Sequence, residues 1–318
     1  MDEAHKPVML EEMLVAIEPK DGCEYLDCTF GSGGYSRAIL DKALCRVHGI
    51  DRDPMIAQYA ETFARKYLKR FGITIGNYSE MGTLKKKFDG VVMDVGVSSM
   101  QLENSNRGFS FMKNGPLDMR MGNSEITAEE IVNNFNKKKL ENIFFILGEE
   151  RMSRSIAQSI YEYRKKTKFT STKQLSSLVC KIYNRRYGRS RIHPATKVFQ
   201  ALRIYINNEL GEIAQGLMAA ENVLKPKGRL VVVTFHSLED RIVKNFIRSR
   251  CKGINLEKRV TFDYVSKKAI KSHYKEIKTN PRARSARLRV ATRNTEKSSI
   301  DNSFFDNLIF SSVGQTLS

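Results

Sequence analysis

Glycines and an acidic residue that could hold a nucleoside lie near the start of the chain. The run EYLDCTFGSGGYS, residues 24–36, joins a short strand-forming stretch to a glycine-rich turn, and a helical pattern follows. Such glycines let a ligand approach the backbone, and the helix N-terminus beyond them presents unpaired N–H groups. Asp51 ends the next strand-like run, 20 residues after Gly31, where a carboxylate can bind both ribose hydroxyls. Because Ser36 replaces the third glycine of a dinucleotide fingerprint, the pattern favours a nucleoside-containing cofactor without requiring a pyrophosphate.

Each of these features has a plainer interpretation. A glycine turn can be only a tight connection between a strand and a helix, and Asp51 can be a helix N-cap. Asp53 is the better N-cap, because Pro54 follows it at the first helical position. This leaves Asp51 available for a ligand.

Candidate catalytic groups follow two later strand-like runs. Residues 88–94 end in Asp94, and the loop after it carries a glycine and two hydroxyls, with Ser98 among them. Residues 229–235 are strongly β-branched and lead directly into His236. In open α/β sheets, ligands bind beyond the carboxyl ends of strands, so we expect Asp94, Ser98 and His236 to share one edge. A capped loop and a loop hydrogen bond are the alternatives.

The elements that must position these residues are predicted from hydrophobic periodicity. We expect strands at residues 25–28, 46–51, 73–75, 88–94, 229–235 and 288–291. The α/β rhythm stops near residue 122, and the capping-box signature at Thr127 and Glu130 opens a series of amphipathic helices. The predicted domains are an α/β domain at 1–121 and 198–318, and an inserted all-helical domain at 122–197 that we expect to recognise the substrate.

Four local predictions are specific. Residues 54–70 form a helix, residues 193–223 form one continuous helix, and residues 224–228 form a turn. The inward side chains expected on the first helix are Ile56, Tyr59, Ala60, Phe63 and Tyr67. Residues 107–121 lack a period but are rich in apolar side chains, which favours a functional loop over disorder.

The charge balance points to a polyanionic partner. The chain of 318 residues carries 54 Lys and Arg against 35 Asp and Glu, a net charge of +19. Such an excess favours nucleic acid or an anionic membrane surface, while a lysine-rich proteome is the alternative. The loop RRYGRSR, residues 185–191, combines arginines with a tyrosine, which suits phosphate contact and base stacking. A solvated basic loop is the plainer interpretation.

Membrane and metal functions are not indicated. No apolar run approaches the ~20 residues of a membrane span, and the N-terminus lacks a signal-peptide pattern. The five cysteines are scattered, without the paired spacing of a zinc site or a disulfide framework. We therefore expect a cytoplasmic protein without a bound metal.

Together these features fit an S-adenosylmethionine-dependent nucleic-acid methyltransferase. A cytosine C5 enzyme needs a thiolate at the ligand edge, and no cysteine follows residues 88–94 closely. Two other classes remain open. A nicotinamide-dependent oxidoreductase would share the glycine turn and Asp51 but has no reason to be so basic. A non-catalytic RNA-binding assembly factor would keep the charge but needs no cofactor residues.

Nine blocks of sequence resemble the bacterial MraW/RsmH family. They are HKPVMLEEML, DCTFGSGGYS, GIDRDP, DVGVSS-x-QL, RGFSFM with GPLDMRM, GEER, HPATKVFQALRI with NEL, FHSLEDRIVK and NPRARS. The resemblance implies a Rossmann-like methyltransferase fold with an inserted all-helical domain, and N4-methylation of a cytidine in the decoding region of small-subunit ribosomal RNA. It also implies the small ribosomal subunit or its rRNA as partner, without DNA or a membrane, and a monomer or homodimer.

The motif positions that match the family imply particular cofactor contacts. They are Gly33, Gly34, Tyr35, Asp51, Tyr78, Asp94 and Gln101. Tyr35 stands where many members have His, and Tyr78 where Phe is usual, but both keep a flat ring. We expect direct in-line methyl transfer, with Asp94 accepting hydrogen bonds from the cytosine amino group, and with His236 and Ser98 as further candidates.

Overall fold

The computed structural model describes residues 7–122, 124–187, 193–252 and 260–297. Over these residues the chain divides into two compact units. The first unit holds residues 7–96 and 210–297, and the second unit holds residues 97–209. Each unit is described by itself.

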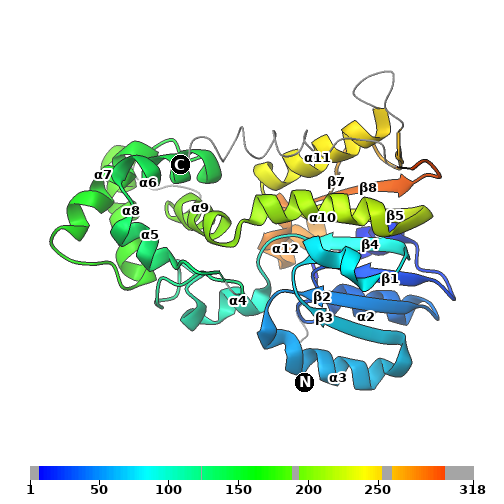
Figure 1. Cartoon of the computed structure of the whole chain (residues 1–318). Helices are drawn as coiled ribbons and strands as arrows, with labels where there is room; N and C mark the ends of the chain where they lie inside the picture. The colour runs from blue at the N-terminus through cyan, green and yellow to red at the C-terminus, as the bar shows by residue number, and fades with distance from the viewer. Residues whose placement is uncertain (1–6, 123, 188–192, 253–259, 298–318) are drawn as a thin grey trace. The chain divides into compact units, whose positions relative to one another are not determined.

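The first unit is built on a mixed, mainly parallel sheet (Figure 1). Its strands are β1 (Glu24–Asp27), β2 (Arg46–Asp51), β3 (Phe71–Ile75), β4 (Phe88–Asp94), β5 (Leu224–Thr234), β6 (Phe262–Tyr264), β7 (Ile270–Lys271) and β8 (Arg287–Arg293). The order is β3-β2-β1-β4-β5-β8-β6, with β7 also paired to β8. Strands β1 to β5 are parallel, and β8 runs antiparallel to β5. The strand order reverses between β1 and β4, and this switch point is where such sheets bind ligands.

Helices cover both faces of this sheet (Figure 1). They are α1 (Leu10–Ile17), α2 (Gly34–Lys42), α3 (Ala57–Tyr67), α10 (Glu209–Val223), α11 (Ser237–Lys252) and α12 (Tyr274–Thr279). The middle strands β4 and β5 are buried almost throughout, because a parallel sheet has helices on both sides. All six predicted strands and the α/β class are confirmed. The short edge strands β6 and β7 were missed, since two or three residues carry no period.

The predicted turn at residues 224–228 is wrong. These residues belong to β5, but the register jumps there: Phe88 pairs with Leu224 and Gly90 with Arg229. Six residues of β5 (224–229) thus face three of β4 (88–90), so the extra residues form a bulge. Lys227 within it has a left-handed φ of 66°.

The predicted helix at 54–70 forms in three pieces: a 3₁₀ turn (Pro54–Ile56), α3, and a second 3₁₀ turn (Leu68–Arg70). The expected inward side chains are buried except Tyr59, which is 55% exposed. Ile56, Ala60 and Phe63 form a narrow apolar stripe, and Tyr59 lies beside it.

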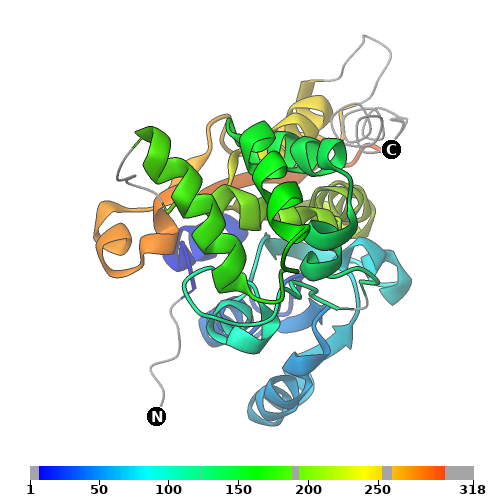
Figure 2. The ribbon, with the colours of Figure 1, turned by 90° about the vertical axis from the view of Figure 1, so that its left-hand side faces the viewer.

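Helices form the second unit (green in Figures 1 and 2). They are α4 (Ser99–Glu103), α5 (Ala128–Asn134), α6 (Lys137–Gly148), α7 (Ser153–Arg164), α8 (Thr172–Tyr187) and α9 (Thr196–Asn207). The predicted capping box is present: Thr127 Oγ1 accepts the Glu130 N–H, and Glu130 Oε2 accepts the Thr127 N–H.

The predicted continuous helix at 193–223 is wrong, because it breaks at Asn208. This residue adopts a left-handed φ of 47° between α9 and α10, a conformation that ends helices and that Asn tolerates.

The second unit is wider than the insertion predicted at 122–197. Asn207 on α9 explains part of the difference, because its amide holds the Met119 carbonyl and the Met121 N–H. These bonds join the end of the 107–121 loop to α9 within the second unit.

Candidate active site

The glycine turn after β1 forms a backbone cradle at the switch point. Gly33 is the N-cap of α2, with a φ of 76° and no side-chain cap on the helix. A Cβ at Gly33 would lie 2.7 Å from a Phe63 ring carbon and 2.9 Å from Phe30. The first N–H groups of α2 have no partner within the helix. The turn therefore requires glycine and presents donors to a ligand.

Asp51, at the end of β2, is fixed to this turn. Its Oδ2 accepts the Gly31 N–H at 2.7 Å, and its Oδ1 accepts the Asp53 N–H at 2.9 Å. Asp53 caps the following turn through the Met55 N–H, which confirms its predicted role. Burial raises the pKa of Asp51. Each carboxylate oxygen keeps a second lone pair, so Asp51 still offers acceptors for ribose hydroxyls.

Asp27, at the end of β1, is a site residue that sequence reasoning missed. It is fully buried, and its carboxylate accepts the Ser36 hydroxyl at 2.7 Å and the Thr29 N–H at 3.2 Å. Burial raises its pKa to about 6. Asp27 thus ties β1 to the first turn of α2. The signal available in the sequence was an acid placed directly before the glycine turn.

Asp94 lies at the end of β4, beside the turn that follows β1. Its N–H donates to Thr29 Oγ1 at 2.7 Å. Among the described residues, its Oδ1 is buried and has no hydrogen-bond partner. Burial raises the pKa of Asp94 well above its usual range, and the nearby charges of Asp27 and Glu239 add to the increase. A buried acceptor without a donor costs free energy, so a donor from a ligand would stabilise this position.

His236 caps helix α11 together with Glu239. The ring Nδ1 accepts the Glu239 N–H at 3.4 Å, and Glu239 Oε2 accepts the N–H groups of Phe235 at 2.7 Å and His236 at 3.1 Å. The ring Nε2 lies 2.9 Å from Glu239 Oε1. This is the reciprocal pattern of a capping box. Because Nδ1 accepts, we assign the proton of the neutral ring to Nε2.

Glu239 belongs to the polar cluster that follows His236 in the sequence, but it was not among the predicted site residues. Its side chain is fully buried, and its charge acts on Asp94. The sequence signal was an acid three residues after His236 at a helix start.

Tyr78 and Tyr35, the two aromatic residues predicted to contact the cofactor, lie in different environments. Tyr78 begins a 3₁₀ helix (Tyr78–Leu84), and its ring lies against Gly216 of α10, where a Cβ would be 2.5 Å from Cδ2. Tyr35 is only 3% exposed, and its hydroxyl donates to the Val8 carbonyl. The Tyr35 ring is thus part of the core, which leaves its backbone as the group for a ligand.

Ser98 and Gln101 belong to the second unit. Ser98 Oγ accepts the Gln101 N–H at 3.2 Å, and Gln101 Oε1 accepts the Ser98 N–H at 3.0 Å, so the two form a capping box at the start of α4. Their catalytic and cofactor roles stay predictions. In the basic loop predicted to bind phosphate, residues 188–191 lie outside the described residues.

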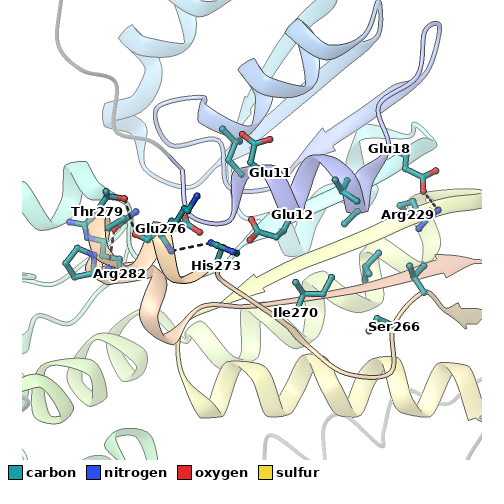
Figure 3. A pocket seen from close by; sticks show the side chains of 18 residues that line it. Glu11, Glu12, Glu18, Arg229, Ser266, Ile270, His273, Glu276, Thr279 and Arg282 are labelled. Carbon is teal, nitrogen blue, oxygen red and sulfur yellow. Dashed lines mark hydrogen bonds and ion pairs between the residues drawn. The ribbon is translucent and has the colours of Figure 1, made fainter.

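A cavity of the first unit lies away from Asp51 and Asp94. It has a volume of about 1480 Å³ and lies between α1 and residues 265–282 (Figure 3). Arg229, midway along β5, also lines it, whereas Asp51 and Asp94 stand at the carboxyl ends of their strands. Within the described part of the chain, no helix is both long and apolar enough to cross a membrane.

Comparisons with known proteins give a consistent result. Residues 2–294 match the MraW methylase family. Ribosomal RNA small subunit methyltransferase H of Rickettsia massiliae is 48% identical over 304 residues, covering 92% of this chain and 98% of that protein. The protein of the same name from Maricaulis maris is 47% identical over 306 residues and 91% of each chain. A solved putative rRNA-methylase from Clostridium thermocellum aligns over 92% of this chain and 98% of that one with a TM-score of 0.44 and 11% identity, too distant to argue from.

Proposed function

The chain belongs to the MraW methylase family of S-adenosylmethionine-dependent methyltransferases, and from that premise we propose its substrate and its catalytic groups. The proposed reaction is methylation of the exocyclic N4 of a cytidine in the decoding region of small-subunit ribosomal RNA. The relatives that match most of this chain are named as small-subunit ribosomal RNA methyltransferases. The net charge of +19 suits an RNA substrate.

The residues at the switch point fit the cofactor. The glycine turn lets a ligand come close to the backbone, where the first-turn N–H groups of α2 are hydrogen-bond donors. Asp51 provides carboxylate acceptors for ribose hydroxyls. When bound, the cofactor supplies an activated methyl group on a sulfonium centre. Gly33, Gly34, the Tyr35 backbone, Asp51 and Tyr78 would hold it.

The buried, unpartnered Oδ1 of Asp94 is the observation that carries the proposed chemistry. An exocyclic amino group has N–H donors and a lone pair delocalised into the ring. Hydrogen bonds accepted by Asp94 would orient the amino group, and N4 must lose a proton once it has gained a methyl group. Burial raises the pKa of Asp94, which makes its carboxylate a stronger base for that proton than an exposed carboxylate.

The structure does not favour a covalent mechanism at cytosine C5. The cysteine nearest the switch point is Cys28, which is buried directly after β1. Burial, followed by the charge of Asp27, raises the pKa of this thiol well above its usual range. A thiol held in its neutral form is a poor nucleophile, so Cys28 is suited to packing.

Nucleoside mass spectrometry tests the reaction. The protein is incubated with methyl-labelled S-adenosylmethionine and either small ribosomal subunits lacking the modification or naked small-subunit rRNA. We expect labelled N4-methylcytidine, and label from subunits alone would show that assembled structure is recognised. Absence of label in both samples, with S-adenosylmethionine binding intact, would overturn the proposed reaction.

A pair of variants on β4 tests Asp94. Asp94→Asn should lower kcat by roughly 10²-fold or more, since the amide cannot take the amino proton. Asp89→Asn is the matched control, because Asp89 lies near the amino end of the same strand and bonds the Glu24 N–H. An unchanged kcat in Asp94→Asn would remove Asp94 from the catalytic role.

A further inference from the structure

Two cavities in the molecule differ in the charges that line them. The cavity of the first unit has a mixed lining of four glutamates and three basic residues: Glu11, Glu12, Glu18, Glu276, Arg229, Lys275 and Arg282 (Figure 3). The second unit has a hollow of about 310 Å³ whose lining includes Lys173 and Lys181 and no acidic residue. A lining with lysines and no acids attracts a polyanion, whereas a lining of mixed charge gives it no net attraction. The charge pattern therefore favours the hollow of the second unit as a contact for RNA.

One face of α8 lines this hollow. Lys173, Ser177 and Lys181 follow one another at intervals of four residues, so they project from the same side of the helix. All three are exposed. The two lysines stand about 12 Å apart along the helix axis. This spacing allows both to contact one extended backbone.

The charges of these two lysines are not neutralised among the described residues. Other lysines of the same unit are paired: Lys138 lies 3.6 Å from Glu141, and Lys165 lies 3.0 Å from Glu162. Neither Lys173 nor Lys181 has an acidic partner within the described ranges. Their charge is therefore available to a ligand.

The tip of the 107–121 loop is fixed beside the start of this helix face. The Thr172 hydroxyl donates to the Lys113 carbonyl at 2.8 Å and accepts the Gly115 N–H at 3.1 Å, while the Thr172 N–H donates to the Gly115 carbonyl at 2.9 Å. Met112 at the tip is 74% exposed. These bonds hold an exposed apolar side chain next to the lysine face.

We propose that the α8 face (Lys173, Ser177, Lys181) and the loop tip (residues 112–114) form a docking surface for the substrate RNA. The lysines contact backbone phosphates, and Met112 packs against a base or sugar. Asn114, Tyr163 and Gln174 complete the hollow and offer hydrogen bonds or a ring face. This assignment rests on the proposed function, since it takes the substrate to be RNA.

A pair of double variants tests this surface. Lys173→Ala with Lys181→Ala should raise the Kd for small ribosomal subunits and for naked small-subunit rRNA by about tenfold. The slope of log affinity against log salt should become less steep by about two, one for each lost phosphate contact. We expect a higher KM with unchanged kcat and unchanged affinity for S-adenosylmethionine. Lys138→Ala with Lys165→Ala is the matched control, removing the same charge from ion-paired positions.

Because binding is measured without turnover, the experiment tests the docking surface independently of the proposed methylation reaction. If the Lys173/Lys181 variant has the same Kd and the same salt slope as wild type, the proposed docking surface is wrong. It is also wrong if the Lys138/Lys165 control loses as much RNA affinity as the Lys173/Lys181 variant. If the wild type gives no N4-methylcytidine while the two lysines still set the salt slope, the surface stands and the reaction is wrong. Met112→Ser should also weaken RNA binding, without changing the slope of log affinity against log salt.

Discussion

His236 and Glu239 cap helix α11 from both directions. The imidazole accepts the Glu239 N–H, while the Glu239 carboxylate accepts two backbone N–H groups and lies 2.9 Å from the ring Nε2. The same carboxylate acts on the pKa of Asp94. The histidine that follows β5 therefore makes structural hydrogen bonds, the alternative to catalysis that its position left open.

Substitution of His236 by Asn separates capping from catalysis. Asn is a good N-cap residue, so His236→Asn should keep the thermal stability of wild type. His236→Ala should lose about 1 kcal/mol. If the ring only caps α11, His236→Asn also keeps kcat. Loss of roughly 10²-fold in kcat with stability intact would instead make His236 a catalytic base.

Asp27 should give the protein a pH-dependent stability. Burial raises its pKa from 3.8 to about 6, so the folded state binds its proton more tightly than the unfolded state. Its stabilising contribution is complete below about pH 4 and is lost as the pH rises through 6, a change of roughly 3 kcal/mol. Urea titrations of wild type and Asp27→Asn between pH 4 and 7 measure this change in the free energy of unfolding. Parallel curves for the two proteins would contradict the raised pKa.

Gly216→Ala should weaken cofactor binding by displacing Tyr78, although Gly216 itself is not a proposed cofactor contact. The new Cβ would lie 2.5 and 2.7 Å from Tyr78 ring carbons, so the ring must move. We expect about tenfold weaker S-adenosylmethionine binding by calorimetry, or ~1.4 kcal/mol. The helix itself should gain up to roughly 1 kcal/mol from Ala. Gly82→Ala is the control, because no atom lies within 4 Å of its added Cβ, and equal affinities would exclude Tyr78 from the site.

Tyr35→Phe should lower stability and spare cofactor binding. The hydroxyl donates to the Val8 carbonyl inside the core, so its loss leaves a buried acceptor and costs roughly 1 kcal/mol or more. Thermal unfolding measures this cost, and calorimetry with S-adenosylmethionine should show wild-type affinity. A large loss of affinity with little change in stability would place the hydroxyl at the ligand.

The sequence by itself determined the order of the core elements and the positions of the candidate site residues. Strand patterns, the glycine turn and the acids Asp51 and Asp94 at strand ends are local features, and parallel topology brings strand ends to one edge. The apolar stripe of α6, with Leu140, Ile143 and Phe144, was equally readable because helix periodicity is local.

Only the tertiary structure decided what each polar group does. Asp27 and Asp94 end two strands and Glu239 lies in the first turn of α11, far apart in the chain. The effect of Asp27 and Glu239 on the pKa of Asp94 depends on burial that no local pattern specifies. The same holds for the His236 ring, the buried Tyr35 hydroxyl and the break at Asn208. Hydrogen-bond partners and desolvation are set by packing between distant segments, so sequence spacing identifies the residues while the fold assigns their chemistry.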